Sequence, residues 1–156
     1  MPAQNADPPV QLIDPRGPRF GAAITSVLLA VALVLGPSWG LPVLIVQTLA
    51  FALGVLLGVR HQPWGWLYRR LVRPRLTSPK HLEDARPPRF AQAVGLAFAL
   101  AGLAGALLSL GALYYVAIGS ALAAALLSAI FDFCLGCEIY LLAQRFRSRR
   151  PASATS

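Results

Sequence analysis

The chain has 156 residues, enough for one ordinary domain, but 56% of them are hydrophobic and only 13% are charged. Together with a mean hydropathy of +0.61, this composition excludes an ordinary soluble globular domain. The formal net charge of +8 does not indicate a nucleic-acid binder, because the basic residues are confined to gaps between apolar runs rather than spread over one face.

Four apolar runs follow a polar, proline-containing leader at residues 1–13, which we expect to be disordered. A membrane-spanning helix needs about 20 apolar residues. The predicted fold is therefore all-α, a polytopic membrane domain at residues 14–146 with four transmembrane helices arranged as two helical hairpins. The expected spans are about residues 20–36, 41–59, 90–113 and 116–143. The last run is predicted as one continuous helix whose final turns lie at the interface, followed by a disordered basic tail at 147–156.

The positions of the charges predict the orientation. Every Lys and Arg precedes the first span, lies between the second and third, or follows the fourth. The positive-inside rule then places both termini and the loop 60–89 of this multi-pass protein in the cytoplasm. The excess of Arg over the single Lys80 suggests a GC-rich bacterial genome, so the expected membrane is a bacterial plasma membrane. Trp39, Tyr114 and Tyr115 are expected to form the outer aromatic belt.

Residues 14–20 and 84–90 match at Asp, Arg, Pro, Arg and Phe. Each copy opens one hairpin, so the pattern indicates a parallel internal repeat about an axis along the membrane normal. The alternative is that two helix starts converged on the same residues. Small residues that recur every fourth position, such as Gly54 and Gly58, indicate close helix seams, either within the chain or in a homo-oligomer.

The segment 131–140 concentrates the reactive groups of the membrane region. Cys134 and Cys137 form a CxxC, and in a continuous helix they would share a face with Glu138 and Arg145. Glu138 would manage protons and Arg145 would balance its charge. Because this position lies towards a helix C-terminus, the dipole and the nearby carboxylates would oppose thiolate formation unless Arg145 or Arg147 compensates, so no strongly activated nucleophile is expected.

Other interpretations of these groups remain open. The cysteines could be small packing residues, or they could bind a metal with His61 or His81, which is the weaker idea because no second ligand pair has metal spacing. Gln47, deep in the second span, is expected to make an interhelical hydrogen bond. The aromatic and basic loop 60–89 suits anionic headgroups or a soluble acidic partner.

Residues 14–20, 89–92 and above all 133–140, with the CLGCE motif, resemble the family of domain of unknown function 4395. The resemblance covers about residues 14–146. It implies a small bacterial membrane protein, of a kind frequent in actinobacteria, whose genes often lie beside thioredoxin-like and rhodanese-type sulfurtransferase genes. It thus implies thiol or sulfur handling for Cys134 and Cys137 without specifying a reaction.

These observations lead to one hypothesis and one alternative. The protein presents a cytoplasmic-face dithiol that exchanges disulfides or sulfane sulfur with a soluble thioredoxin-like or rhodanese-type partner. This role corresponds to a thiol-disulfide oxidoreductase or a sulfur-transfer partner, although the sequence does not establish an enzyme. No cofactor, metal or nucleic acid is expected. The alternative is a non-catalytic scaffold or small transporter subunit in which the cysteines only pack.

Overall fold

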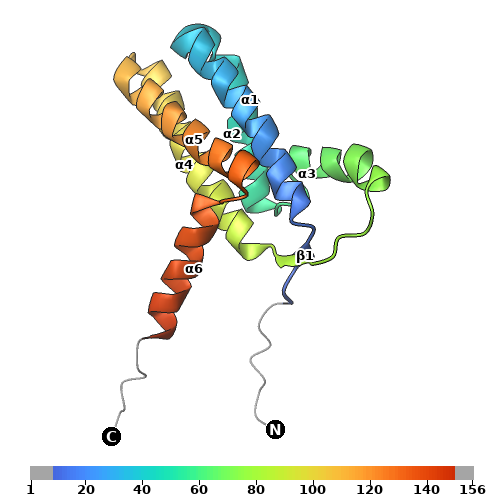
Figure 1. Ribbon diagram of the computed structural model, residues 1–156. Coiled ribbons are helices and arrows are strands. Elements are labelled where there is room, and N and C mark those ends of the chain that lie inside the picture. The colour runs from blue at the N-terminus through green and yellow to red at the C-terminus, as the bar shows by residue number, and fades with distance from the viewer. Residues whose placement is uncertain (1–8, 150–156) are drawn as a thin grey trace, which may run out of the picture.

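The computed structural model describes residues 9–149. Four helices form a bundle, and Figure 1 shows their arrangement: α1 (Arg16–Trp39), α2 (Leu41–Leu56), α4 (Arg86–Leu107) and α5 (Gly111–Phe131). The remaining elements are β1 (Leu12–Ile13), α3 (Pro63–Leu67), the π-helical turn η1 (Tyr68–Val72), the 3₁₀ turn η2 (Arg73–Arg75), β2 (Glu83–Asp84) and α6 (Leu135–Ser148).

Three of the helices, α1, α4 and α5, are long and apolar enough to cross a membrane, whereas α2 is apolar but has only 16 residues. In the most apolar stretch of each helix, only 33% of the residues of α1, 17% of those of α4 and 22% of those of α5 are buried inside the protein. The outward faces carry large apolar side chains such as Val34, Leu56 and Val116, which are 87%, 72% and 68% exposed. Apolar surface on this scale requires lipid around it, so the chain is a membrane protein.

Glycines on α4 allow the bundle to pack closely. A Cβ on Gly102 would lie 2.4 Å from Cδ1 of Ile118, and one on Gly95 would lie 2.7 Å from the ring of Phe51. Leu29 and Leu44, both fully buried, complete the core between α1 and α2. Because lipid provides no hydrophobic force between helices, such close contact is what holds them together.

The last turns of α1 bend at Gly36, which has φ 75° and is followed by Pro37. The hydroxyl of Tyr114 donates to the carbonyl oxygens of Ala32 (2.7 Å) and Gly36 (3.3 Å) at this kink. Backbone carbonyls freed by a kink need a partner at membrane depth. The expectation that Tyr114 belongs to an outer aromatic belt is therefore wrong, because the side chain is fully buried, whereas Trp39 is 80% exposed.

Side chains at the arginine-rich end join helices from different hairpins. Arg19, at the start of α1, donates to the carbonyl oxygens of Ala129 (3.0 Å) and Ile130 (3.3 Å) at the end of α5. Arg89, at the start of α4, donates to those of Val55 (2.7 Å) and Leu56 (3.3 Å) at the end of α2. These two starts and two ends thus lie at one end of the bundle.

Strands β1 and β2, which precede α1 and α4, pair antiparallel. Deeper in the bundle, Nε2 of Gln47 donates to Oγ1 of Thr25 at 3.1 Å. The expected interhelical hydrogen bond of Gln47 is confirmed.

The fourth apolar run differs most from expectation. Instead of one helix over 116–143, α5 begins at Gly111 and ends at Phe131, and α6 begins at Leu135. The break occurs because Asp132 adopts the left-handed conformation (φ 55°), which Asp tolerates better than most residues. In Figure 1, α6 leaves the bundle beside the start of α4.

The predicted ends of the chain are only partly covered. Residues 1–8 of the expected leader and 150–156 of the expected tail lie outside the described residues. Within the rest, Leu12–Ile13 form β1, and α6 continues to Ser148.

Candidate functional site

The break between α5 and α6 places the CxxC at the start of a helix. Cys134 has an extended backbone (φ −87°, ψ 104°) and is the N-cap residue of α6, so Cys137 lies in the first turn. The expectation that the motif lies towards a helix C-terminus is wrong, because it assumed a helix that continued through Asp132. Thiolates are favoured at helix N-termini, where backbone N–H groups and the helix dipole face them.

Cys134 caps the helix through its sulfur atom. The backbone N–H of Cys137 donates to Sγ of Cys134 (N to Sγ 3.4 Å), and the backbone N–H of Glu138 donates to the Cys134 carbonyl oxygen (3.0 Å). Both cysteines are free thiols, and both are partly buried. Both thiols are therefore partly accessible from outside the protein, and the sulfur of Cys134 accepts a hydrogen bond from a backbone N–H that the helix holds in place.

The two thiols have opposite acidities. A hydrogen bond from the Cys137 thiol is the largest influence on Cys134; with the backbone N–H groups of Cys137 and Gly136 and the Ser128 hydroxyl, it outweighs burial and lowers the pKa of Cys134 to about 6. The pKa of Cys137 is raised, first because it donates to Cys134 and then because of its burial, with the charges of Cys134, Glu83 and Glu138 adding to the effect. Of the two thiols, Cys134 is therefore the more acidic and Cys137 the less acidic.

Contacts on both sides hold this turn in place. A Cβ on Gly136 would lie 2.6 Å from Cα of Ala91, so α6 crosses α4 at a point where only glycine fits. One turn further, the rings of Tyr140 and Phe90 have centroids 5.7 Å apart. On the other side, Arg19 caps the last carbonyl groups of α5. The turn is fixed by α4 and α1 rather than by its own sequence alone.

The other two predicted site residues are less closely tied to the sulfurs. Glu138 and Arg145 are both exposed, and within residues 9–149 the one ion pair within 4.0 Å joins Arg86 and Asp84. The expected pairing of Glu138 with Arg145 does not form. Glu138 stays next to Cys137, where its charge contributes to the raised pKa of that thiol, while roles for Glu138 in proton handling and Arg145 in charge balance stay predictions.

Sequence reasoning missed one contributor, the hydroxyl of Ser128, which helps to lower the pKa of Cys134. In an unbroken helix Ser128 would lie six residues before the cysteine and point elsewhere, so no sequence signal was available. Of the two histidines considered as metal ligands, His61 and His81, His61 has Nδ1 2.9 Å from the carbonyl oxygen of Leu57. No cluster of three or more His, Cys, Asp or Glu residues suited to a metal occurs in the described part of the chain.

A family model described as a domain of unknown function (DUF4395) matches residues 13–145. The chain belongs to the DUF4395 family. The match covers the whole bundle and the CxxC turn, so this fold and this motif lie within the DUF4395 domain. No curated protein and no solved structure matches the chain.

Proposed function

We propose that this DUF4395 protein crosses the plasma membrane four times and exposes its CxxC turn to the cytoplasm, where the two thiols exchange disulfides with a soluble partner. The exchange rests on one observation above the others: Cys134 is the N-cap residue of α6, with the Cys137 backbone N–H directed at its sulfur (3.4 Å). This arrangement supports an activated thiol paired with a resolving thiol.

The fourth crossing is α2. At 1.5 Å per residue, 16 residues reach about 24 Å, which is slightly less than the hydrocarbon thickness of about 30 Å. Helices of this length are accommodated by local thinning of the bilayer. The start of α2 follows the end of α1 through Gly40, and its last carbonyl groups accept from Arg89 at the opposite end of the bundle. These contacts support a helix that runs the full depth of the bundle.

The charges support the orientation. The two turns at the far end of the bundle, at Gly40 and at 108–110, contain no charged residue. The opposite end has the arginines that cap α2 and α5, and the basic segment from η1 to η2. By the positive-inside rule this end is cytoplasmic, and it is also the end at which the CxxC turn lies.

The two hairpins also support an internal repeat. Asp14 and Asp84, seventy positions apart in the matching segments, each accept from the backbone N–H two residues later, at 3.0 and 2.9 Å. Arg19 caps the second helix of the other hairpin, and Arg89 does the same in return. An antiparallel pairing of β1 with β2 is what a twofold axis between two copies of one strand produces.

The exchange has two steps. The Cys134 thiolate attacks one sulfur of a partner disulfide, forms a mixed disulfide and releases the other partner sulfur as a thiolate. Cys137, after losing its proton, attacks the Cys134 sulfur, releases the second partner thiolate and leaves a Cys134–Cys137 disulfide. Two electrons pass from the CxxC to the partner. If the partner carries a persulfide, attack on its outer sulfur leaves a Cys134 persulfide, and attack by Cys137 on that Cys134 sulfur releases hydrosulfide.

A trapping experiment tests the proposal. Full-length Cys137→Ser protein in membranes is mixed with an oxidised thioredoxin-like protein, and adducts are separated on a non-reducing gel. We expect a mixed disulfide that accumulates in this variant, because the second step is blocked, and that disappears when Cys134 is also changed to Ser. Cys134→Ser with Cys137 intact is the matched control and should trap little. Equal trapping by both single variants would contradict the assignment of Cys134 as nucleophile.

The alternative, in which the cysteines only pack, predicts a different outcome. Packing thiols would remain unreactive towards alkylating reagents in membranes and would not change between reduced and oxidised states. In a scaffold or transporter subunit of that kind, the Cys134→Ala variant would be labelled no less than the native protein, because the native thiols would not be labelled either.

A further inference from the structure

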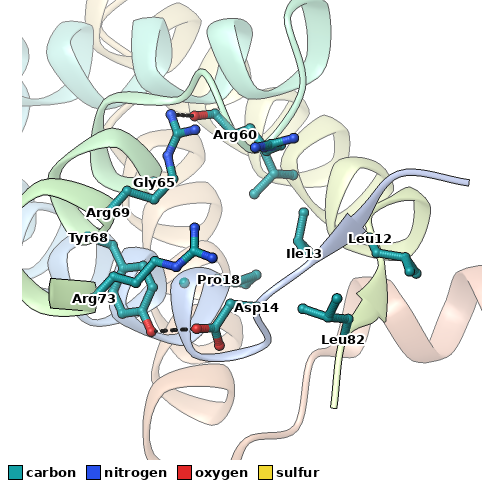
Figure 2. Close-up of a pocket in the computed structure, with 12 residues that line it drawn as sticks. Leu12, Ile13, Asp14, Pro18, Arg60, Gly65, Tyr68, Arg69, Arg73 and Leu82 are labelled. Atoms are coloured by element: carbon teal, nitrogen blue, oxygen red, sulfur yellow. Dashed lines mark hydrogen bonds between the residues drawn. The ribbon is translucent and has the colours of Figure 1, made fainter. Parts of the chain in front are cut away.

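A separate pocket lies at the arginine-rich end of the bundle, formed by β1, the start of α1, the turn that follows α2 and the segment from α3 to η2. Its volume is about 160 Å³. Figure 2 shows its lining side chains, and neither cysteine is among them. The pocket is therefore distinct from the CxxC turn.

Three arginines line this pocket: Arg60, Arg69 and Arg73. None of them has a carboxylate within 4.0 Å among residues 9–149. Nη2 of Arg69 donates to the carbonyl oxygen of Arg60, which fixes this guanidinium in the wall, while its Nε is buried and has no hydrogen-bond partner among the described residues. The charges of the three guanidinium groups are therefore not balanced by an ion pair within the described residues.

The pocket has one carboxylate, Asp14, and it is already satisfied by other donors. Its Oδ1 accepts from the backbone N–H of Arg16 and its Oδ2 from the hydroxyl of Tyr68, both at 3.0 Å. Burial and then the bond to Asp14 raise the pKa of Tyr68, so this phenol remains a donor at neutral pH. In Figure 2 the Asp14–Tyr68 pair forms one wall, and the guanidinium of Arg73 lies beside the open space. The pocket as a whole keeps an excess of positive charge.

The rest of the lining is apolar and lies close to the membrane. Leu12, Ile13, Val59 and Leu82 contribute side chains to it. On the adjoining segment, Trp66 and Leu71 are 51% and 53% exposed, as expected for residues inserted at the level of the headgroups. A suitable ligand therefore has an anionic group that accepts several hydrogen bonds and an attached apolar part.

We propose that this pocket binds the phosphate of an anionic phospholipid, with the guanidinium groups of Arg69 and Arg73 on the phosphate oxygens and the apolar lining against the glycerol and the first acyl carbons. Guanidinium groups match phosphate geometry and form strong, charge-assisted hydrogen bonds. The shared chemistry is a phosphate group, and the apolar lining favours a lipid over a soluble phosphate as its source. Binding a lipid here ties the loop 60–89 to the start of α1.

Binding is measured on the full-length protein in a neutral detergent, by titration with three probes: short-chain phosphatidylglycerol, short-chain phosphatidylcholine and inorganic phosphate. We expect phosphatidylglycerol to bind most tightly and inorganic phosphate to compete with it only weakly. If inorganic phosphate binds as tightly as the anionic lipid, the ligand is a soluble phosphate and the lipid proposal is wrong. Equal binding of both lipids also overturns it, because the arginines would then contribute no selectivity for net charge.

Two variants with the same loss of charge test the site. Arg73 and Arg75 are both exposed residues of η2, but only Arg73 lines the pocket. We expect Arg73→Gln to weaken phosphatidylglycerol binding at least about tenfold and Arg75→Gln less than about twofold. Arg73→Lys should give an intermediate loss, because it keeps the charge without the planar donor pair. Equal losses in the Arg73→Gln and Arg75→Gln variants would mean that only surface charge is sensed, and would overturn the proposal.

Discussion

Cys134 owes its low pKa mainly to the neighbouring thiol of Cys137. The Cys137 thiol is the largest influence that lowers the pKa of Cys134. Cys137→Ser keeps a hydroxyl donor at that position, whereas Cys137→Ala removes it. In both variants Cys134 is the one remaining thiol of the chain, so alkylation reports on it alone.

The rate of alkylation by iodoacetamide is measured against pH for these two variants. Below the pKa the thiol is protonated and reacts slowly, and above it the thiolate reacts at a constant rate. We expect a midpoint near 6 for Cys137→Ser, as in the native pair, and a midpoint about one unit higher or more for Cys137→Ala. Identical midpoints in the two variants would show that the neighbouring side chain does not set the acidity.

At the scale of the elements, the position of α6 depends on one glycine. Gly136 has no room for a Cβ against Ala91, whereas Gly119, on α5, has no atom within 4 Å of the position that a Cβ would take. Replacing each by Ala therefore compares a blocked helix crossing with an open one. The two substitutions add the same methyl group, so they form a matched pair.

We expect Gly136→Ala to lower the free energy of unfolding by about 1–3 kcal/mol, because the helices must separate or shift. It should also slow alkylation of Cys134 at neutral pH, since the shift moves the Cys137 N–H away from the sulfur. Gly119→Ala should be neutral or slightly stabilising, because alanine favours the helix. Thermal unfolding in detergent and the labelling rate are the two measurements. A neutral Gly136→Ala would contradict the proposed role of the crossing.

The sequence predicts the helical class and the approximate places of the four helices of the bundle, because hydropathy and turn residues are local signals. It could not predict the break at Asp132. The residues around this position are apolar and compatible with a helix, and contacts distant in sequence, from Arg19 and Ala91, favour the break. The sequence therefore places the two cysteines at the wrong end of a helix, which reverses the predicted effect of the dipole on their acidity.

Tyr114 shows the same limit. Its position between two apolar runs is typical of an interfacial aromatic residue. Its actual role depends on the kink at Gly36 in another helix, whose carbonyl groups need a donor. No pattern along the chain connects residues 78 positions apart.

At the scale of the whole molecule, the two hairpins are joined by reciprocal arginines. Each guanidinium satisfies the last carbonyl groups of a helix in the other hairpin, where helix ends leave four such groups without a partner. Only one of these joints, that of Arg19, ends next to the CxxC turn. The same contact between an arginine and helix-end carbonyl groups therefore stabilises the bundle in both hairpins, and in one of them it also supports the turn that contains Cys134.

This difference separates the expected effects of Arg19 and Arg89. Arg19→Gln and Arg89→Gln should each lower the free energy of unfolding by about 1 kcal/mol, a value discounted for the exposure of both side chains. Arg86→Gln, which removes an exposed ion pair with Asp84, is the control and should have a smaller effect.

In a Cys137→Ser background, Arg19→Gln should raise the midpoint of Cys134 alkylation, because the end of α5 loosens beneath the turn, while Arg89→Gln should leave it unchanged. Unfolding in detergent and the pH profile of labelling separate the two effects. If Arg19→Gln destabilises the protein and Arg89→Gln does not, the two arginines do not contribute equally to stability. The repeat in the sequence would then not correspond to equivalent contacts in the two hairpins.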